Sequence, residues 1–103
     1  MTISMYQASV PRITNMLNNL GAILDKAQAH VDAKKLDAAA LTNARLFPDM
    51  LAMNRQVHIA TDTAKGVVAR LAGVEIPAYE DNEISFADLK ARVDKTVAFV
   101  QSF

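Results

Sequence analysis

The chain has 103 residues, which is enough for one domain and too few for two. Hydrophobic residues make up 51% of it, which excludes an intrinsically disordered chain, and the 11 basic residues balance the 11 acidic ones. This neutral balance, without a basic patch, argues against nucleic acid and anionic membranes as partners. There is no cysteine, which excludes disulfides, thiolate catalysis and cysteine-bound metals.

Targeting and membrane-spanning segments are not visible in the sequence. The N-terminus lacks the basic start and continuous apolar core of a secretory signal. No apolar run approaches the ~20 residues that cross a bilayer. We therefore expect a cytoplasmic protein.

The first predicted helix runs from Ser4 or Met5 to about Ala33. Pro11 interrupts the pattern, so the helix either kinks there or begins near Val10. Apolar residues recur at alternating steps of four and three, which is typical of antiparallel helix bundles. They are Tyr6, Val10, Ile13, Leu17, Leu20, Leu24, Ala27 and Val31.

A polar turn over residues 33–37 follows, with Asp37 as a candidate cap for a short helix over 38–44. We expect Leu46 and Phe47 to be tucked under the connection to the next helix. The methionines Met16, Met50 and Met53 are interpreted as core filler.

The central predicted helix covers residues 50–71, and the rest of the chain is expected to cover its apolar face. Pro48 and Asp49 suit its first turn, and Gly73 suits its end. Gly66 is interpreted as a site of close packing against a neighbouring helix. Steps of three and four separate the apolar positions Met50, Met53, Val57, Ala60, Ala64, Val67 and Leu71.

A long link over residues 74–84 is expected to cross the end of the bundle. Ser85 is the predicted cap of the last helix, with Asp88 in the capping-box position. The apolar stripe of this helix comprises Phe86, Leu89, Val93, Val97 and Val100. Its predicted solvent side comprises Asp88, Lys90, Arg92, Asp94 and Lys95.

The apolar stripe of the last helix still runs where the sequence stops, at Phe103. The sequence therefore predicts one all-α domain over residues 1–103, an up-and-down bundle of three long helices and one short helix. Such a bundle would leave part of its apolar surface exposed, and large exposed apolar surfaces mark interfaces. We expect a fourth long helix to be missing from the chain or supplied by another molecule.

Several blocks of the sequence carry a family resemblance: NARLFPDM, DTAKG, ARLAGVEIP and EDNEISFADL. They resemble the bacterial domain-of-unknown-function family one-nine-nine-three, over nearly the whole chain. Members of that family continue into a further helix and are placed among DinB-like proteins. That resemblance implies a four-helix bundle of a group that includes metal-dependent enzymes and thiol transferases, with no established activity for the family itself.

The resemblance also implies a candidate metal site. DinB-like bundles commonly hold a divalent metal with three histidines, and His58 lies where the first is expected, with Asp62 one turn further on the same face. The alternative for Asp62 is an ion pair with Lys65. The only other histidine is His30, and Thr63 stands where relatives often have a histidine.

Two functions follow from these observations, and the sequence leaves open whether the chain is an enzyme. The first is a module that self-associates, as a homodimer, through its uncovered apolar face. The second is a divergent metal-dependent hydrolase or thiol transferase, in which His58 ligates the metal and further ligands come from outside the chain. No catalytic residue, cofactor-binding residue or small-molecule ligand is assignable from motifs, because no nucleophile–histidine–acid set or phosphate-binding loop is visible.

Overall fold

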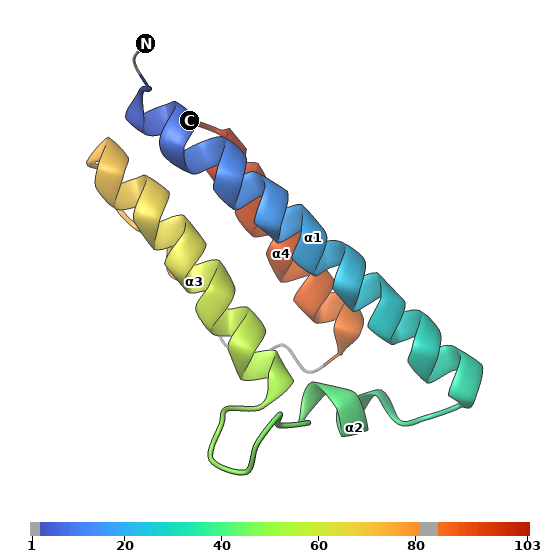
Figure 1. Cartoon of the computed structure of the whole chain (residues 1–103). Coiled ribbons are helices and arrows are strands. Elements are labelled where there is room, and N and C mark those ends of the chain that lie inside the picture. Colours follow the sequence, from blue (N-terminus) through green and yellow to red (C-terminus); the bar gives the residue numbers. More distant parts are fainter. Residues whose placement is uncertain (1–2, 81–84) are drawn as a thin grey trace.

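The structure is a computed structural model that describes residues 3–80 and 85–103. Its elements in these ranges are α1 (Met5–Lys34), α2 (Ala38–Thr42), α3 (Met53–Ala72) and α4 (Phe86–Gln101) (Figure 1). The predicted all-α bundle, with three long helices and one short helix, is confirmed. Within the described ranges, no helix is both long and apolar enough to cross a membrane.

The start of α1 is fixed by a reciprocal cap. The Gln7 amide donates to Ser4 Oγ (3.1 Å), and the Ser4 amide donates to Gln7 Oε1 (3.2 Å). The helix therefore begins at Met5 and continues through Pro11, so the alternative of a start near Val10 is wrong. Ser4 lies about two helical turns before Pro11, so the cap starts the helix well ahead of the proline.

The connection from α2 to α3 differs from the prediction. Asp37 does cap α2, since its Oδ1 accepts from the Ala39 amide at 3.0 Å. However, α3 begins at Met53 and not at residue 50. Pro48 and Asp49 instead form the centre of a turn, which is closed by the Met50 amide donating to the Phe47 carbonyl at 2.9 Å.

Leu46 and Phe47 are not tucked under this connection, so that prediction is wrong. Their exposed fractions are 89% and 63%. The Met53 amide donates to the Ala44 carbonyl at 2.8 Å, which closes the base of the loop and directs its apex away from the bundle (Figure 1). Met16 and Met50 are also exposed and are not core filler.

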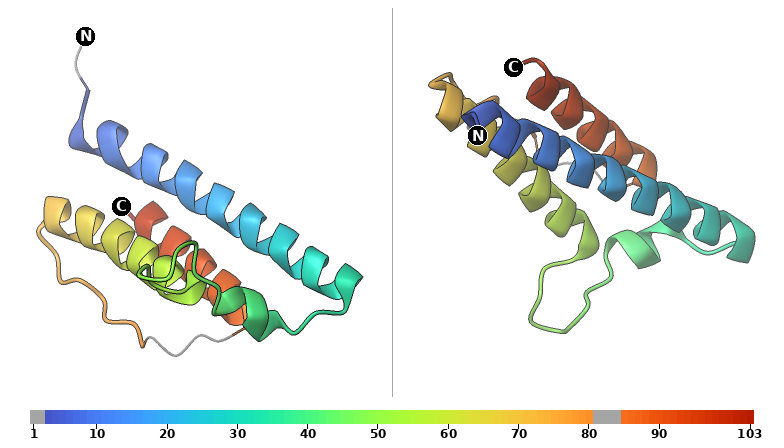
Figure 2. Two further views of the ribbon diagram at one scale, coloured as in Figure 1. Left: turned by 60° about the horizontal axis from the view of Figure 1, so that its bottom comes forward. Right: turned by 45° about the horizontal axis from the view of Figure 1, so that its top comes forward.

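The three long helices do not simply alternate in direction. α1 runs opposite to α3 and α4, whereas α3 and α4 run in the same direction (Figures 1 and 2). The chain after Gly73 therefore returns along α3, and the prediction that it crosses the end of the bundle is wrong for the described residues 74–80. The last part of the predicted link, residues 81–84, lies outside the described residues.

The core forms where α4 packs against both other long helices. α1 packs mainly on α4, α3 packs on α4 to a lesser extent, and α1 and α3 barely meet. The predicted stripes of the first and last helices supply most of the core, apart from the exposed Tyr6. The predicted stripe of the central helix is only partly right, because Met50, Ala60 and Leu71 are exposed and Val68, outside that stripe, is buried. Ser85 caps α4 by accepting from the Asp88 amide at 3.1 Å. The buried core residues are Val10, Leu17, Leu24, Val31, Val57, Ala64, Val68, Phe86, Leu89, Val93 and Val100.

Candidate functional site

An apolar groove lies between α1 and α3, on the side of the bundle that α4 does not cover. It has a volume of about 430 Å³, and only Arg12 and Thr63 contribute polar side chains to it. We call it the α1/α3 groove. Its lining residues are Arg12, Ile13, Met16, Leu17, Leu20, Ala60, Thr63, Ala64 and Val67.

A second hollow lies between the same helices, nearer the end of α3. It is lined by Met5, Tyr6, Ser9, Val10, Val68, Leu71, Ala72 and Phe103. Met5 is 65% exposed and Leu71 is 53% exposed. The apolar surface of the α1/α3 groove thus extends along the bundle, and burying such surface against another apolar surface is favourable.

A polar cluster fills the opposite side of the bundle, between α3 and α4, and Arg92 is its centre. This side chain is 3% exposed, so the prediction that it faces solvent is wrong. Its Nε donates to Thr61 Oγ1 (2.7 Å), its Nη2 to Asp62 Oδ1 (2.7 Å) and its Nη1 to the Glu80 carbonyl (3.1 Å). These acceptors offset the cost of removing the guanidinium from water.

Tyr79 covers this cluster from the returning segment. The Lys65 ammonium lies 3.7 Å from the centroid of its ring, the Lys95 ammonium 4.2 Å and the Arg92 guanidinium carbon 5.3 Å. Cations are attracted to the face of an aromatic ring at such distances. Lys65 is itself buried, at 5% exposed, and pairs with Asp62 at 3.2 Å. Tyr79 therefore ties the segment 74–80 to α3 and α4 through the cations of both helices.

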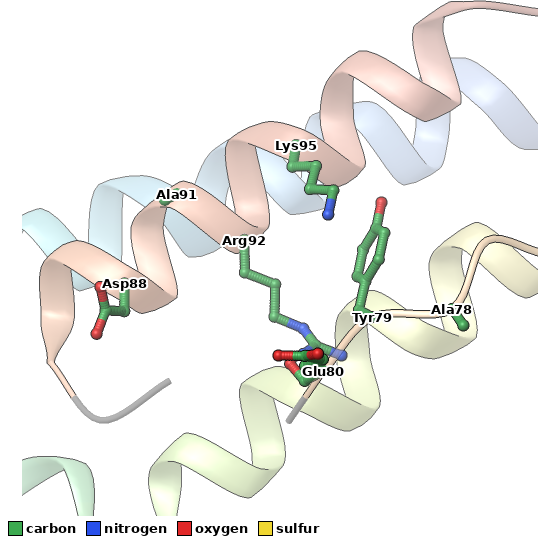
Figure 3. A pocket seen from close by; sticks show the side chains of 7 residues that line it. All are labelled: Ala78, Tyr79, Glu80, Asp88, Ala91, Arg92 and Lys95. Atoms are coloured by element: carbon green, nitrogen blue, oxygen red, sulfur yellow. The ribbon is translucent and has the colours of Figure 1, made fainter. Parts of the chain in front are cut away.

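A polar pocket of about 520 Å³ opens beside this ring (Figure 3). Lys95 and Tyr79 point toward each other across it, from α4 and from the returning segment (Figure 3). Its lining also includes the acidic residues Glu80 and Asp88 beside Arg92. Charges of both signs meet here, so the pocket has no clear preference for an anion or a cation.

The two predicted metal ligands lie at the edge of the polar cluster. His58 is 2% exposed, and its Nδ1 is 3.5 Å from Arg55 Nη1. Asp62 follows one turn later, and its Oδ1 accepts from both Arg92 and Lys65, so the predicted ion pair with Lys65 is present. The other histidine, His30, is exposed in the last part of α1.

A metal site requires more ligands than these two. In the parts of the chain that the structure describes, no group of three histidine, cysteine or acidic side chains is placed to hold a metal ion. Zinc takes three or four protein ligands. His58 and Asp62 therefore do not form a complete metal site by themselves.

Sequence reasoning missed Arg92, although one signal pointed to it. Arg92 and Thr96 are four residues apart on α4, directly beside the apolar stripe, and Thr96 is fully buried. Thr61 is also fully buried, on the facing helix α3. Small polar residues at inward positions of two neighbouring helices indicate a buried polar contact, and Arg92 supplies the donors for it.

The comparisons with known proteins place the chain in a family. A family model described as "Domain of unknown function (DUF1993)" matches residues 5–103. No curated protein matches the chain. A DinB family member protein from Shewanella denitrificans is 40% identical in sequence to this chain. Its crystal structure matches the structure of this chain with a TM-score of 0.90.

That match covers 96% of this chain and 57% of the Shewanella protein, so this chain spans little more than half of the length of its relative. The likeness confirms the DinB-like fold that the sequence blocks indicated. Because the family model matches almost every residue, this chain belongs to the DUF1993 family of DinB-like helical bundles.

Proposed function

We propose that this chain is a helical-bundle module that self-associates, as a homodimer, by covering the α1/α3 groove. The observation that carries this proposal is the apolar lining of that groove. Seven of its nine residues are apolar; of these, Met16 and Ala60 are exposed, and Ile13, Leu20 and Val67 are half-buried. Helices of bundles bury their apolar stripes against other helices, and here an apolar groove between α1 and α3 is lined by no residue of α4.

The polar cluster around Arg92 is assigned a structural role, because its hydrogen bonds join α3, α4 and the returning segment. The two sides of the bundle then have different tasks. The polar side holds the three helices together, and the apolar side binds a second molecule.

Sedimentation velocity over a range of about 1–100 µM tests this proposal, since stable interfaces of ordinary size give affinities within or below this range. The wild-type chain is expected to sediment as a dimer at the upper end. Ala60→Arg places a charged, bulky side chain in the groove at an exposed position, so it should yield a folded monomer.

Ala22→Arg is the matched control, because Ala22 is an exposed helical alanine on α1 that does not line the groove. It should sediment as the wild type does. A wild-type chain that stays monomeric at 100 µM contradicts the proposal, and so does an Ala60→Arg chain that still forms the dimer.

The second candidate is a divergent DinB-like metal-dependent hydrolase or thiol transferase. The burial of His58 beside Asp62, in a chain of DinB-like fold, supports this candidate. His58 and Asp62 would supply two ligands, and the remaining ligands would come from outside this chain. The metal would supply Lewis-acid activation of a bound water or thiol.

Metal content measured after purification without added metal separates the two candidates. The metal candidate predicts at least one equivalent of a divalent ion in the wild type and its loss in His58→Gln, with the helical circular dichroism unchanged. Equal metal content in the two proteins contradicts it.

A further inference from the structure

The segment over residues 74–80, which returns along α3, covers charged side chains and not the apolar core. We call it the strap. Two buried cations contact it, Lys65 of α3 and Arg92 of α4. No residue of the strap, all of which the structure describes, belongs to the apolar core or to the partly buried apolar residues packed against that core. The strap can therefore move without exposing the core to water.

One side chain, Tyr79, holds the strap to both helices. Its ring centroid lies 3.7 Å from Lys65 Nζ and 4.2 Å from Lys95 Nζ, so the ring meets an ammonium group of each helix. Figure 3 shows the ring rising from the strap beside the side chains of Arg92 and Lys95. Because these attractions all act on one ring, they are lost together when the ring moves away.

The backbone of the strap adds little to this attachment. The Val74 amide donates to the Ala69 carbonyl at 2.9 Å, which ends α3. Beyond it, the backbone of residues 75–80 makes no hydrogen bond to the backbone of another described residue. Arg92 Nη1 donates to the Glu80 carbonyl at 3.1 Å. Segments with few backbone hydrogen bonds and few buried apolar contacts open at a lower free energy than the whole protein unfolds.

We propose that the strap opens and closes over Lys65 and Arg92 in the folded protein, with Tyr79 as its latch. In the closed state the ring shields the Lys65 ammonium from solvent. In the open state both cations are accessible to solvent and solutes, while α1, α3 and α4 stay packed. This inference does not rest on the self-association proposed above, because the strap and the α1/α3 groove lie on opposite sides of the bundle.

The open state leaves neither cation without a counter-ion. Asp62 Oδ1 lies 3.2 Å from Lys65 Nζ and 2.7 Å from Arg92 Nη2, and all three residues belong to α3 and α4. These ion pairs can persist when the strap leaves, and water then replaces the Glu80 carbonyl as an acceptor. The two states therefore differ in access to the cations and not in their pairing with Asp62.

Acetylation of lysines by N-hydroxysuccinimidyl acetate measures this access, because the amine must reach the reagent to attack it. Peptide mass spectrometry gives the rate at Lys65 and, in the same molecule, at Lys26, an exposed lysine of α1. In the wild type we expect Lys65 to react at least about 10-fold more slowly than Lys26, as its contacts with the ring are desolvated. Equal rates would show that the strap does not shield Lys65 and would overturn the proposal.

Urea separates opening of the strap from unfolding of the chain. Opening exposes little surface, so the Lys65 rate in the wild type should hardly change with urea concentration below the unfolding transition. Global unfolding exposes the core, and the unfolded fraction rises steeply with urea. A Lys65 rate that rises in parallel with the unfolded fraction would mean that only unfolding uncovers Lys65, which contradicts the proposal whatever the variants show.

Tyr79→Ala removes the latch and should raise the Lys65 rate at least about 10-fold, with the Lys26 rate and the helical circular dichroism unchanged. Tyr79→Phe keeps the ring, so its Lys65 rate should stay within about threefold of the wild type. Tyr6→Ala is the matched control, because it makes the same change at a half-exposed position of α1. An unchanged Lys65 rate in Tyr79→Ala, or an equal rise in either of the other two variants, overturns the role of Tyr79 as the latch.

Discussion

Arg92 shows how a single buried cation can organise one side of a small bundle. Its guanidinium is 3% exposed, and its donors reach Thr61 and Asp62 on α3 and the Glu80 carbonyl of the returning segment. Thr61 suits this role because its hydroxyl donates to the Val57 carbonyl of the same helix, with Thr61 Oγ1 and the carbonyl oxygen 3.0 Å apart. The hydroxyl oxygen can therefore accept from Arg92.

Replacement of Arg92 tests this organising role. Arg92→Met keeps an unbranched, apolar stem but removes every donor, which leaves buried acceptors without their partner. Hydrogen bonds to charged groups contribute about 1.5–3 kcal/mol each. The bond to Asp62 contributes less, because that side chain is 43% exposed. We therefore expect the free energy of unfolding to fall by about 2–4 kcal/mol. Urea unfolding measures it.

The control for this substitution is Lys26→Met, which removes one positive charge from an exposed position of α1. It should change the free energy of unfolding by less than about 0.5 kcal/mol. An Arg92→Met chain as stable as this control contradicts the structural role of the cluster.

The pair of Lys90 and Asp25 joins α4 to α1 and gives stability a dependence on pH. Lys90 Nζ lies 2.9 Å from Asp25 Oδ2, and this hydrogen bond raises the pKa of Lys90 above 10.5, more than desolvation lowers it. Because the pKa of Lys90 is higher in the folded state than in the unfolded state, the contribution of this pair to the stability of the fold is fully present below pH 10.5. It is lost as the pH rises through the folded-state pKa.

The difference in urea midpoint between the wild type and Lys90→Gln should therefore be constant from pH 7 to pH 10 and should shrink above that range. The effect is expected to be small, because the pair is exposed to solvent, and to fall further in high salt. Lys26→Gln controls for the loss of one charge. A difference that grows with pH contradicts this assignment.

At the scale of the helix, Gly66 inside α3 and Gly73 directly after it have opposite roles. Gly66 lies inside the helix, and a Cβ there would meet Arg70 Nη1 of the same helix at 3.0 Å. The predicted close packing of Gly66 against a neighbouring helix is therefore wrong. Gly73 ends the helix with a φ of 71°. Of these two glycines, only Gly73 has a left-handed backbone conformation, which residues with a side chain adopt with strain.

Gly66→Ala should stabilise the protein by up to about 1 kcal/mol, because alanine is the better helix former and the exposed guanidinium of Arg70 can move aside. Gly73→Ala should destabilise it by about 1 kcal/mol, although its Cβ would meet no atom within 4 Å. Thermal unfolding of both variants checks the signs, and a loss of stability in Gly66→Ala would show that Arg70 is fixed in place.

The sequence was sufficient to predict the helices but not how the loops and polar residues are placed. Periodicity gives the buried stripes of α1 and α4, because burial of one face is a property of each helix alone, but it gives only part of the buried face of α3, where Ala60 is exposed and Val68 is buried. Pro48 and Asp49 predict a helix start but form a turn, since proline and aspartate suit both positions. The burial of Arg92 depends on which face of α4 meets α3 and on the path of residues 74–80, and neither is local information.

At the scale of the whole molecule, the bundle has one side filled and one side bare. The polar cluster closes the side of α3 and α4, whereas the α1/α3 groove remains open along much of the bundle. If a second copy covers that groove, dissociation of the dimer and unfolding of its chains are coupled. The stability of the chain then depends on its concentration.

We therefore expect the thermal midpoint of the wild type to rise with protein concentration. A hundredfold increase contributes about 2.7 kcal/mol per dimer, or half of that per chain, which for a domain of this size corresponds to roughly 5–10 °C. Differential scanning calorimetry at two concentrations above the dimer dissociation constant measures it. In Ala60→Arg the midpoint should be the same at both concentrations, since that chain has no partner to lose. A wild-type midpoint that is equally independent of concentration would mean that the groove stays bare in solution.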